Sequence, residues 1–229
     1  MRHLAVLLAI VAVVLVLIPY AVVPFYRFID PVSMPMLWRY ATGGRVERID
    51  VPLAHISPAL RLAVIVAEDG SFCRNPGIDL GEIRAALRQF NDNLDESRGA
   101  STITQQTAKN LFLWQGRSFV RKALEIPLAV WMTLVLPKRR ILEIYLNIAE
   151  WGPNGEFGAE AAARWAFGKS AQNLSPYQAA ELAAILPNPV LRSAKTPSVL
   201  VRRLAGLYER RAAEFSGLDA CVRGPSHCP

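Results

Sequence analysis

The N-terminal apolar run is the feature that most limits how this chain can fold. From Leu4 to Val23 the sequence reads LAVLLAIVAVVLVLIPYAVV. These are about 20 uncharged residues, the length that crosses a hydrocarbon layer of ~30 Å. A cleaved signal peptide is the alternative, with an apolar core of about 7–15 residues followed by a small-x-small cleavage site. This run is longer, and the PYAVVPFYRF around its end is a poor cleavage site. We therefore predict an uncleaved transmembrane anchor over residues 4–23.

The length of chain on each side of the anchor predicts an orientation. The flanking charges decide little, because Arg2 on one side faces Arg27 and Arg39 on the other. A tail of residues 1–3 leaves about 200 residues on the far side, and long domains cross a membrane regardless of flanking charge. We expect the tail in the cytoplasm and the remaining chain in a periplasm-like compartment.

Helical patterns dominate the chain after a connector. Residues 24–51 contain Pro and Arg with few helical signals, so we expect a connector there. Helical spacing or helix-start signals then follow over residues 57–69, 79–92, 101–113, 119–136, 138–151, 159–167, 175–186 and 196–215. No convincing alternation typical of strands and no internal repeat occurs in the sequence. We predict an all-α domain over residues 52–215 and a C-terminal tail over residues 216–229.

Two of these helices can be predicted in more detail. Asp79 resembles a capping residue, and Ile83, Leu87 and Phe90 recur after it at helical spacing. The helix over residues 196–215 is expected to turn one apolar side inward, formed by Leu200, Leu204, Leu207 and Phe215.

The overall charge favours an anionic substrate. The formal net charge is +7 and the pI is near 9.7. Basic proteins also bind anionic membranes non-specifically, so the charge alone does not choose between these readings. Nucleic acid is disfavoured as a partner by the anchor and by the lack of a recognisable nucleic-acid-binding motif.

The three cysteines lack the spacing of a metal site, and no metal site is expected. In an oxidising compartment Cys221 and Cys228 could close a small loop and leave Cys73 free. The sequence leaves open whether this pair forms.

Two adjacent acids end the first predicted helix of the domain. Glu68 and Asp69 oppose the helix dipole, which costs a few tenths to about 1 kcal/mol. A carboxylate that ends an apolar segment can have a raised pKa, as a general acid or base requires. A solvated helix end explains the two residues equally well.

A run of polar residues opens the helix that begins near Ser101. Thr102, Gln105, Gln106 and Lys109 follow Ser101 in this helix. Small hydroxyls and free N–H groups at a helix start favour an oxyanion or a sugar hydroxyl. A capped surface helix explains Ser101, but it gives no reason for two adjacent amides beside Lys109.

The next helices also carry charged residues at regular spacing. Arg117, Arg121 and Glu125 are spaced by four and share one helix face. An exposed Arg–Glu ladder is the simpler interpretation, worth about 0.3–0.5 kcal/mol per pair. Further along, three cations begin a helix at Lys138, and solvation and a basic surface facing the membrane explain them equally well.

Five stretches in order resemble the motifs of one family. They read EDGSF, RGASTITQQTAKNLFL, RKALE, KRRILEIYLN and AAELAAILPNP. They resemble the glycosyltransferase domain that polymerises bacterial cell-wall glycan from lipid II, and the resemblance covers residues 52–197. The stretch LNIAEWGPNGEFGAEAAARWAFGKSA is similar to monofunctional members, and no Ser is followed three residues later by the Lys of a transpeptidase. One position departs from the family, because Asn75 stands where the first motif usually has His.

The resemblance implies a lysozyme-like helical domain with a smaller membrane-proximal lobe. It also implies an inverting transfer that forms β-1,4-linked glycan and releases polyprenyl pyrophosphate. Glu68 would be the general base for the acceptor hydroxyl, and Asp69 would support it. Glu125 would hold the second charged position near the donor pyrophosphate.

The remaining polar residues would bind substrate. Positive charge for the pyrophosphate would come from Lys109, Arg117 and Arg121, because a good leaving group needs charge stabilisation more than a proton. Neutral hydrogen bonds to sugar hydroxyls and phosphate oxygens would come from Ser101, Thr102, Gln105 and Gln106.

The resemblance also implies the setting of the reaction. The partners would be lipid II, the growing glycan chain and membrane lipid, at the periplasmic side of a bacterial inner membrane. Other cell-wall synthesis and division proteins are further potential partners. No cofactor would be essential, although Mg²⁺ or Mn²⁺ is compatible with the chemistry. The alternatives are a lysozyme-like lytic enzyme and a non-catalytic lipid II-binding membrane protein.

Overall fold

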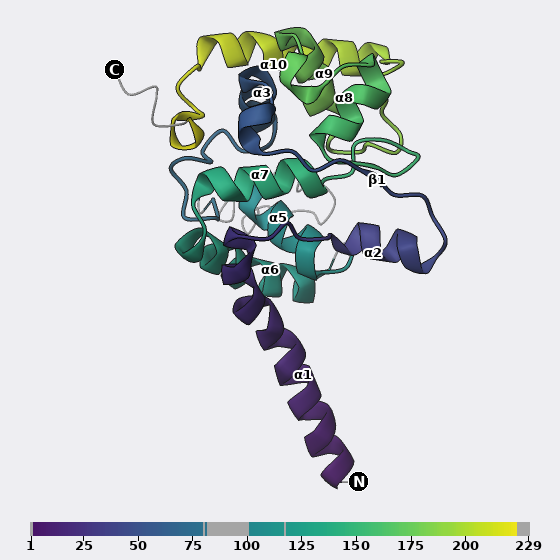
Figure 1. Cartoon of the computed structure of the whole chain (residues 1–229). Helices are drawn as coiled ribbons and strands as arrows, with labels where there is room; N and C mark the ends of the chain where they lie inside the picture. Colours follow the sequence, from purple (N-terminus) through teal and green to yellow (C-terminus); the bar gives the residue numbers. More distant parts are fainter. Residues whose placement is uncertain (1, 80, 82–100, 117, 224–229) are drawn as a thin grey trace, which may run out of the picture.

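The protein is mostly helical, as the sequence predicts (Figure 1). The computed structural model describes residues 2–79, 81, 101–116 and 118–223. The predicted helix with Ile83, Leu87 and Phe90, and also Arg117, therefore lie outside the described residues. The elements in chain order are α1 (Arg2–Val22), η1 (Val23–Arg27), α2 (Met34–Ala41), β1 (Glu47–Arg48), η2 (Leu53–His55), α3 (Pro58–Glu68), α5 (Ile103–Phe112), α6 (Phe119–Val135), α7 (Lys138–Ile148), β2 (Glu156–Phe157), α8 (Ala159–Phe167), η3 (Ala171–Asn173), α9 (Pro176–Ile185), α10 (Val199–Glu214) and η4 (Ala220–Val222).

Helix α1 stands out from the other helices as a separate rod (Figure 1). Its 21 residues span about 30 Å at the rise of an α-helix. Apolar side chains along it are exposed, among them Leu4 and Leu15. By length and composition, the helical segment Arg2–Arg27 is long and apolar enough to cross a membrane. At its base the Trp131 Nε1 of α6 donates to the Tyr20 carbonyl at 3.0 Å, which joins α1 to the folded domain.

Two elements form where the sequence shows few helical or strand signals. Helix α2 occupies Met34–Ala41, with Ser33 before it and a Pro in its first turn. The connector predicted over residues 24–51 contains this helix, whose eight residues are too few to show a clear apolar period. β1 and β2 pair in parallel over two residues each, which is too short for the alternation that predicts strands.

The remaining helices form two packed groups. Helices α3, α9 and α10 pack on one another, and α5 packs on α6 and α7 (Figure 1). Helix α9 is buried along most of its length, and its Ala residues allow close packing against α3 and α10. The group with α6 lies next to α1, so it is the part of the domain nearest the predicted anchor.

The inward side of α10 differs from the predicted one. Val201 and Ala205 are buried, whereas Leu200 and Phe215 are 51% and 49% exposed. Leu204 packs against the core as predicted. The buried stripe runs through Val201, Leu204 and Ala205, so the predicted side was shifted around the helix. The pattern allowed this error because Leu and Val occur on several sides of the helix.

A disulfide joins Cys73 to Cys221, with the two Cα atoms 5.5 Å apart. The question that the sequence left open is thereby answered, because Cys221 is bonded to Cys73 and does not pair with Cys228. Sequence proximity favoured the short loop, but the fold brings η4 back beside the segment after α3, where Arg139 Nη1 of α7 donates to the Val222 carbonyl at 3.1 Å.

We expect the Cys73–Cys221 bond to contribute about 2–5 kcal/mol to the free energy of unfolding, because it closes a long loop in the unfolded chain. The sequence separation of the two cysteines is 148. Urea unfolding in detergent, without reductant, would measure the free energy of unfolding of the wild type and of Cys73→Ser, and we expect it to be lower in Cys73→Ser. Reductant should lower the stability of the wild type to a similar level and leave Cys73→Ser unchanged. Cys228→Ser is the matched control, and an equal loss in that variant would contradict the pairing.

Candidate active site

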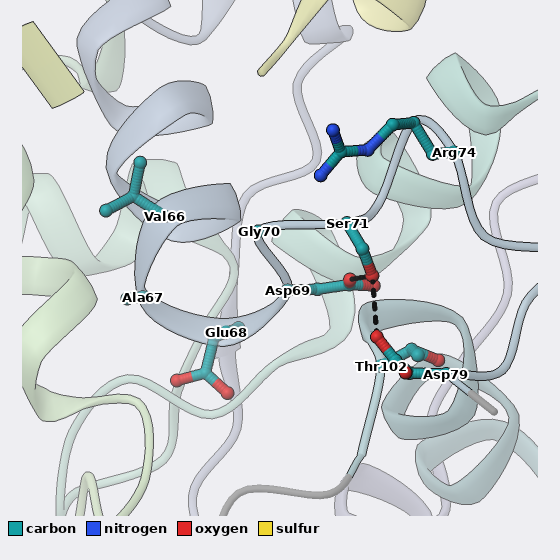
Figure 2. A pocket seen from close by; sticks show the side chains of 9 residues that line it. All are labelled: Val66, Ala67, Glu68, Asp69, Gly70, Ser71, Arg74, Asp79 and Thr102. Carbon is teal, nitrogen blue, oxygen red and sulfur yellow. Dashed lines mark hydrogen bonds between the residues drawn. The ribbon is translucent and has the colours of Figure 1, made fainter. Parts of the chain in front are cut away.

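The C-terminal end of α3 carries the two acids. Ser57 caps the start of this helix by accepting from the Leu60 N–H at 3.0 Å, and Pro58 is its first residue. The apolar side of α3 is buried, and the helix ends at Glu68, with Asp69 as its C-cap. The two carboxylates point in different directions (Figure 2), so they occupy separate environments.

Glu68 lies against two residues of other helices. Its Oε2 accepts from Gln106 Nε2 of α5 at 2.7 Å, and Gln106 Oε1 accepts from the Tyr145 hydroxyl of α7 at 3.1 Å. Burial raises the pKa of Glu68 above its ordinary value, and the Gln106 hydrogen bond and the charge of Lys109 oppose this rise. A carboxylate with a raised pKa is suited to accept a proton near neutral pH.

Asp69 is bound within the protein. Its carboxylate accepts from Asn75 Nδ2 at 2.9 and 3.1 Å, from Ser71 Oγ at 3.1 Å and from the Ile103 N–H at 3.1 Å. Burial nonetheless raises the pKa of Asp69. Asp69 therefore fastens the end of α3 to the start of α5.

Lys138, the first residue of α7, also points toward the segment that follows α3. Its Nζ donates to Asn75 Oδ1 at 2.9 Å and lies 4.6 Å from the centre of the Phe72 ring. Burial lowers the pKa of Lys138 to about 8. Neither solvation nor a basic surface facing the membrane describes this residue, and the sequence carries no signal for its inward position.

The start of α5 is closed by its own residues. Thr102 and Gln105 form a capping box, in which each side chain accepts from the backbone N–H of the other. The Thr102 hydroxyl also donates to the Gly77 carbonyl at 2.6 Å. Thr102 is 2% exposed and Gln105 is fully buried. Their side chains thus organise the helix start, whereas Gln106 faces Glu68.

A second cluster lies around Glu125 of α6. Glu125 is 2% exposed and forms ion pairs with Arg121 Nη1 at 2.6 Å and Lys122 Nζ at 2.7 Å. Lys122 Nζ also donates to Ser101 Oγ at 2.9 Å. The interpretation as an exposed ladder was wrong, because Glu125 is buried. Lys122 was not among the predicted site residues, although its position three residues before Glu125 predicts a neighbour on the same face.

Lys109 of α5 is affected by the charges of both Glu68 and the cluster around Glu125. Burial lowers the pKa of this half-buried amine, and the negative charges of Glu125 and Glu68 oppose that change. The same amine feels the positive charges of Arg121 and Lys122. Lys109 is therefore a cation within the electrostatic reach of both acids.

A polar cavity of about 390 Å³ opens beside α3 (Figure 2). Its lining consists of Val66, Ala67, Glu68, Asp69, Gly70, Ser71, Arg74, Asp79 and Thr102. Among the described residues, no three His, Cys, Asp or Glu side chains gather to hold a metal ion.

This arrangement can combine proton transfer with anion binding. Glu68 is a desolvated carboxylate beside an open cavity, and the positive charge of Lys109 acts on it. Arg121 adds positive charge in the cluster around Glu125, on the helix that packs against α5. Such a site suits a reaction in which a hydroxyl loses its proton while an anionic group departs.

Comparison with known proteins gives the family. The transglycosylase family model matches residues 37–211. A biosynthetic peptidoglycan transglycosylase of Rhodopseudomonas palustris (strain TIE-1) is 57% identical over 202 residues, which cover 88% of this chain and 85% of the relative. Proteins of the same name from Nitrobacter hamburgensis and Agrobacterium fabrum are 55% and 49% identical, each over 91% of this chain and 92% of the relative. The chain therefore belongs to the transglycosylase family.

Proposed function

We propose that the chain is a membrane-anchored peptidoglycan glycosyltransferase, which polymerises lipid II into β-1,4-linked glycan strands. The relatives named biosynthetic peptidoglycan transglycosylases support this assignment. The observation that carries it is the packing of two polar groups on neighbouring helices. Gln106 of α5 holds Glu68, and α6, which packs on α5, carries the buried Glu125 with its ion pairs to Arg121 and Lys122. A polymerase that expels pyrophosphate needs such cations beside its leaving-group site.

In the proposed reaction Glu68 acts as the general base. It takes the proton of the acceptor GlcNAc 4-hydroxyl as that oxygen attacks the anomeric carbon of the donor MurNAc. The bond between this carbon and the donor pyrophosphate breaks, and the lipid pyrophosphate leaves with the bonding electrons. Attack from the opposite face turns the α linkage into a β linkage. Gln106 donates to Glu68 and thereby favours its ionised form before substrate binds.

The cations would stabilise the departing pyrophosphate. A glycosidase protonates a poor leaving group and needs an acid beside its base. Pyrophosphate leaves readily, so positive charge is the larger need. Lys109 and Arg121 supply it from the described residues, with Arg117 as a further candidate. Glu125 would hold Arg121 and Lys122 in place through its two ion pairs.

The remaining predicted binding residues fall into two groups, half-buried residues and residues that are buried within the protein. Ser101 and Gln106 are half-buried and stay candidates for hydrogen bonds to sugar or phosphate. Thr102 and Gln105 are engaged in the capping box, so we assign them the support of α5 rather than direct contact. Asp69 likewise supports Glu68 by holding the neighbouring segment to α5.

We propose that α1 anchors the domain at the periplasmic face of a bacterial inner membrane. Apolar side chains near its base are exposed, with Phe28 at 83% and Trp38 at 71%, as expected for a lobe that touches lipid. The Cys73–Cys221 bond supports an oxidising compartment. Donor and acceptor both carry polyprenyl tails, so an anchor would raise the local concentration of enzyme at its substrates.

Incubation of the full-length protein with purified lipid II in detergent tests this function. We expect glycan chains to lengthen while polyprenyl pyrophosphate is released. A lytic enzyme would leave lipid II unchanged and degrade finished glycan, and a non-catalytic binding protein would leave both lipid II and finished glycan unchanged. Either of these results would overturn the assignment. A parallel reaction with chelator measures any requirement for a divalent cation.

A further inference from the structure

The side chain of Asn75 connects several parts of the segment between α3 and Asp79. Its Nδ2 donates to both oxygens of Asp69, at 2.9 and 3.1 Å, and to Ser71 Oγ at 3.1 Å. Its Oδ1 accepts from Lys138 Nζ at 2.9 Å and from the Gly77 N–H at 3.0 Å. One amide thus satisfies partners at the end of α3, within the segment and at the start of α7.

The surrounding charges fix the orientation of this amide. Asp69 carries only acceptors when ionised, and the Lys138 ammonium carries only donors. A flipped Asn75 would place its oxygen against the Asp69 carboxylate and its NH₂ against the Lys138 amine. Both contacts would be repulsive, so the amide has one allowed orientation between a negative and a positive group.

The contacts of Asn75 extend to the proposed catalytic residues. Asp69 accepts from the Ile103 N–H, and the Gly77 carbonyl accepts from the Thr102 hydroxyl, so two bonds hold the segment against the first turn of α5. Gly77 has φ +97°, and a Cβ there would lie 2.5 Å from the Ala129 carbonyl oxygen of α6. The same helix α5 carries Gln106, which holds Glu68.

We propose that Asn75 is a positioning residue of the transfer reaction, which locks the α3 end to the α5 start so that Glu68 and Gln106 meet. This inference rests on the proposed function of Glu68. It also gives a reason for an amide at this position. Because an amide does not titrate, the lock stays the same across the pH range in which an imidazole would change its charge.

Three charged or polar groups of the described residues determine what a titrating side chain would feel there. Asp69 lies on one side of Asn75 and Lys138 on the other, and Asp79 reaches the cluster through its bond from Ser71 Oγ. Cys73 is disulfide-bonded and does not titrate. The negative and positive neighbours oppose one another, so an imidazole at this position should titrate near its ordinary pKa of about 6.5.

Rates of lipid II polymerisation by Asn75→Ala and Asn75→His test the proposal between about pH 5.5 and 7.5, a range that spans the ordinary His pKa and lies below the pKa of about 8 of Lys138. We expect Asn75→Ala to lower kcat by about 10- to 100-fold at every pH, as expected for a small misplacement of reacting groups. The rate of Asn75→His relative to wild type should fall below about pH 6.5, because an imidazolium cannot accept from Lys138 and is repelled by it. If Asn75 had a purely structural role, the substitutions would lower the stability of the protein, and the rate of Asn75→His relative to wild type would not change with pH.

Asn173→Ala, at an exposed position of η3, is the matched control and should retain the wild-type rate. If Asn75→Ala does not fold, the pH dependence of Asn75→His decides the question alone. An Asn75→His rate ratio that is flat with pH, or an Asn75→Ala rate within about twofold of wild type, overturns the positioning role. An inactive wild type would instead overturn the proposed function itself.

Discussion

Glu68→Gln is expected to lower kcat for lipid II polymerisation by about 10²- to 10⁴-fold, the usual contribution of a general base. The amide has nearly the shape of the carboxylate but cannot take the proton of the attacking hydroxyl. It can still form a hydrogen bond with the Gln106 side chain, which now donates to Glu68 at 2.7 Å. Folding and lipid II binding should therefore survive, and parallel measurements of kcat, binding and melting temperature check all three.

Glu214→Gln is the matched control, because Glu214 is exposed at the end of α10. Its rate should equal that of the wild type. A Glu68→Gln rate within about tenfold of wild type would exclude Glu68 as the base, since base catalysis is worth more than that.

The pH dependence of the wild type gives a second readout on Glu68. A general base works when it is deprotonated, so kcat/KM should rise as the pH increases through its pKa. Burial raises the pKa of Glu68 above its ordinary value of 4.5, so the acidic limb should lie above that pH. The same limb should be absent in whatever residual activity Glu68→Gln retains.

The sequence was most informative where local patterns decide the structure. Ser57–Pro58 fixed the start of α3, and the helical spacing after residue 118 predicted α6. Charge spacing also identified Arg121 and Glu125 as neighbours, although it did not show that Glu125 is buried. Local signals therefore located most helices and several of the polar side chains that gather in the candidate site.

What the sequence could not show depends on contacts between distant segments. Cys73 meets Cys221 across 148 residues, and Lys138 reaches Asn75 from another helix. The two acids that oppose the dipole of α3 had no visible partner in the sequence. Their partners, Asn75 and the Ile103 N–H for Asp69 and Gln106 for Glu68, become neighbours only when α5 and α7 pack against α3.

The second large effect is expected for Lys109→Met, which removes the charge and keeps a side chain of similar length. Lys109 is half-buried on α5, and the negative charges of both Glu68 and Glu125 act on its amine, so we propose that it stabilises the departing pyrophosphate. Loss of one such preorganised group costs about 10²- to 10³-fold in kcat. Polymerisation rates with saturating lipid II measure this loss, and Lys169→Met, at an exposed position after α8, is the control.

Lys109→Met should also move the acidic limb of kcat/KM to higher pH. The positive charge of Lys109 lowers the pKa of Glu68, so its removal leaves burial less opposed and raises that pKa further. A substitution that merely loosened the fold would lower the rate without moving this limb in a defined direction. A reduced kcat with an unmoved or lowered acidic limb would therefore contradict a shared site of Glu68 and Lys109. A rate near that of the wild type would remove the cation from the mechanism, because pyrophosphate departure would then not depend on it.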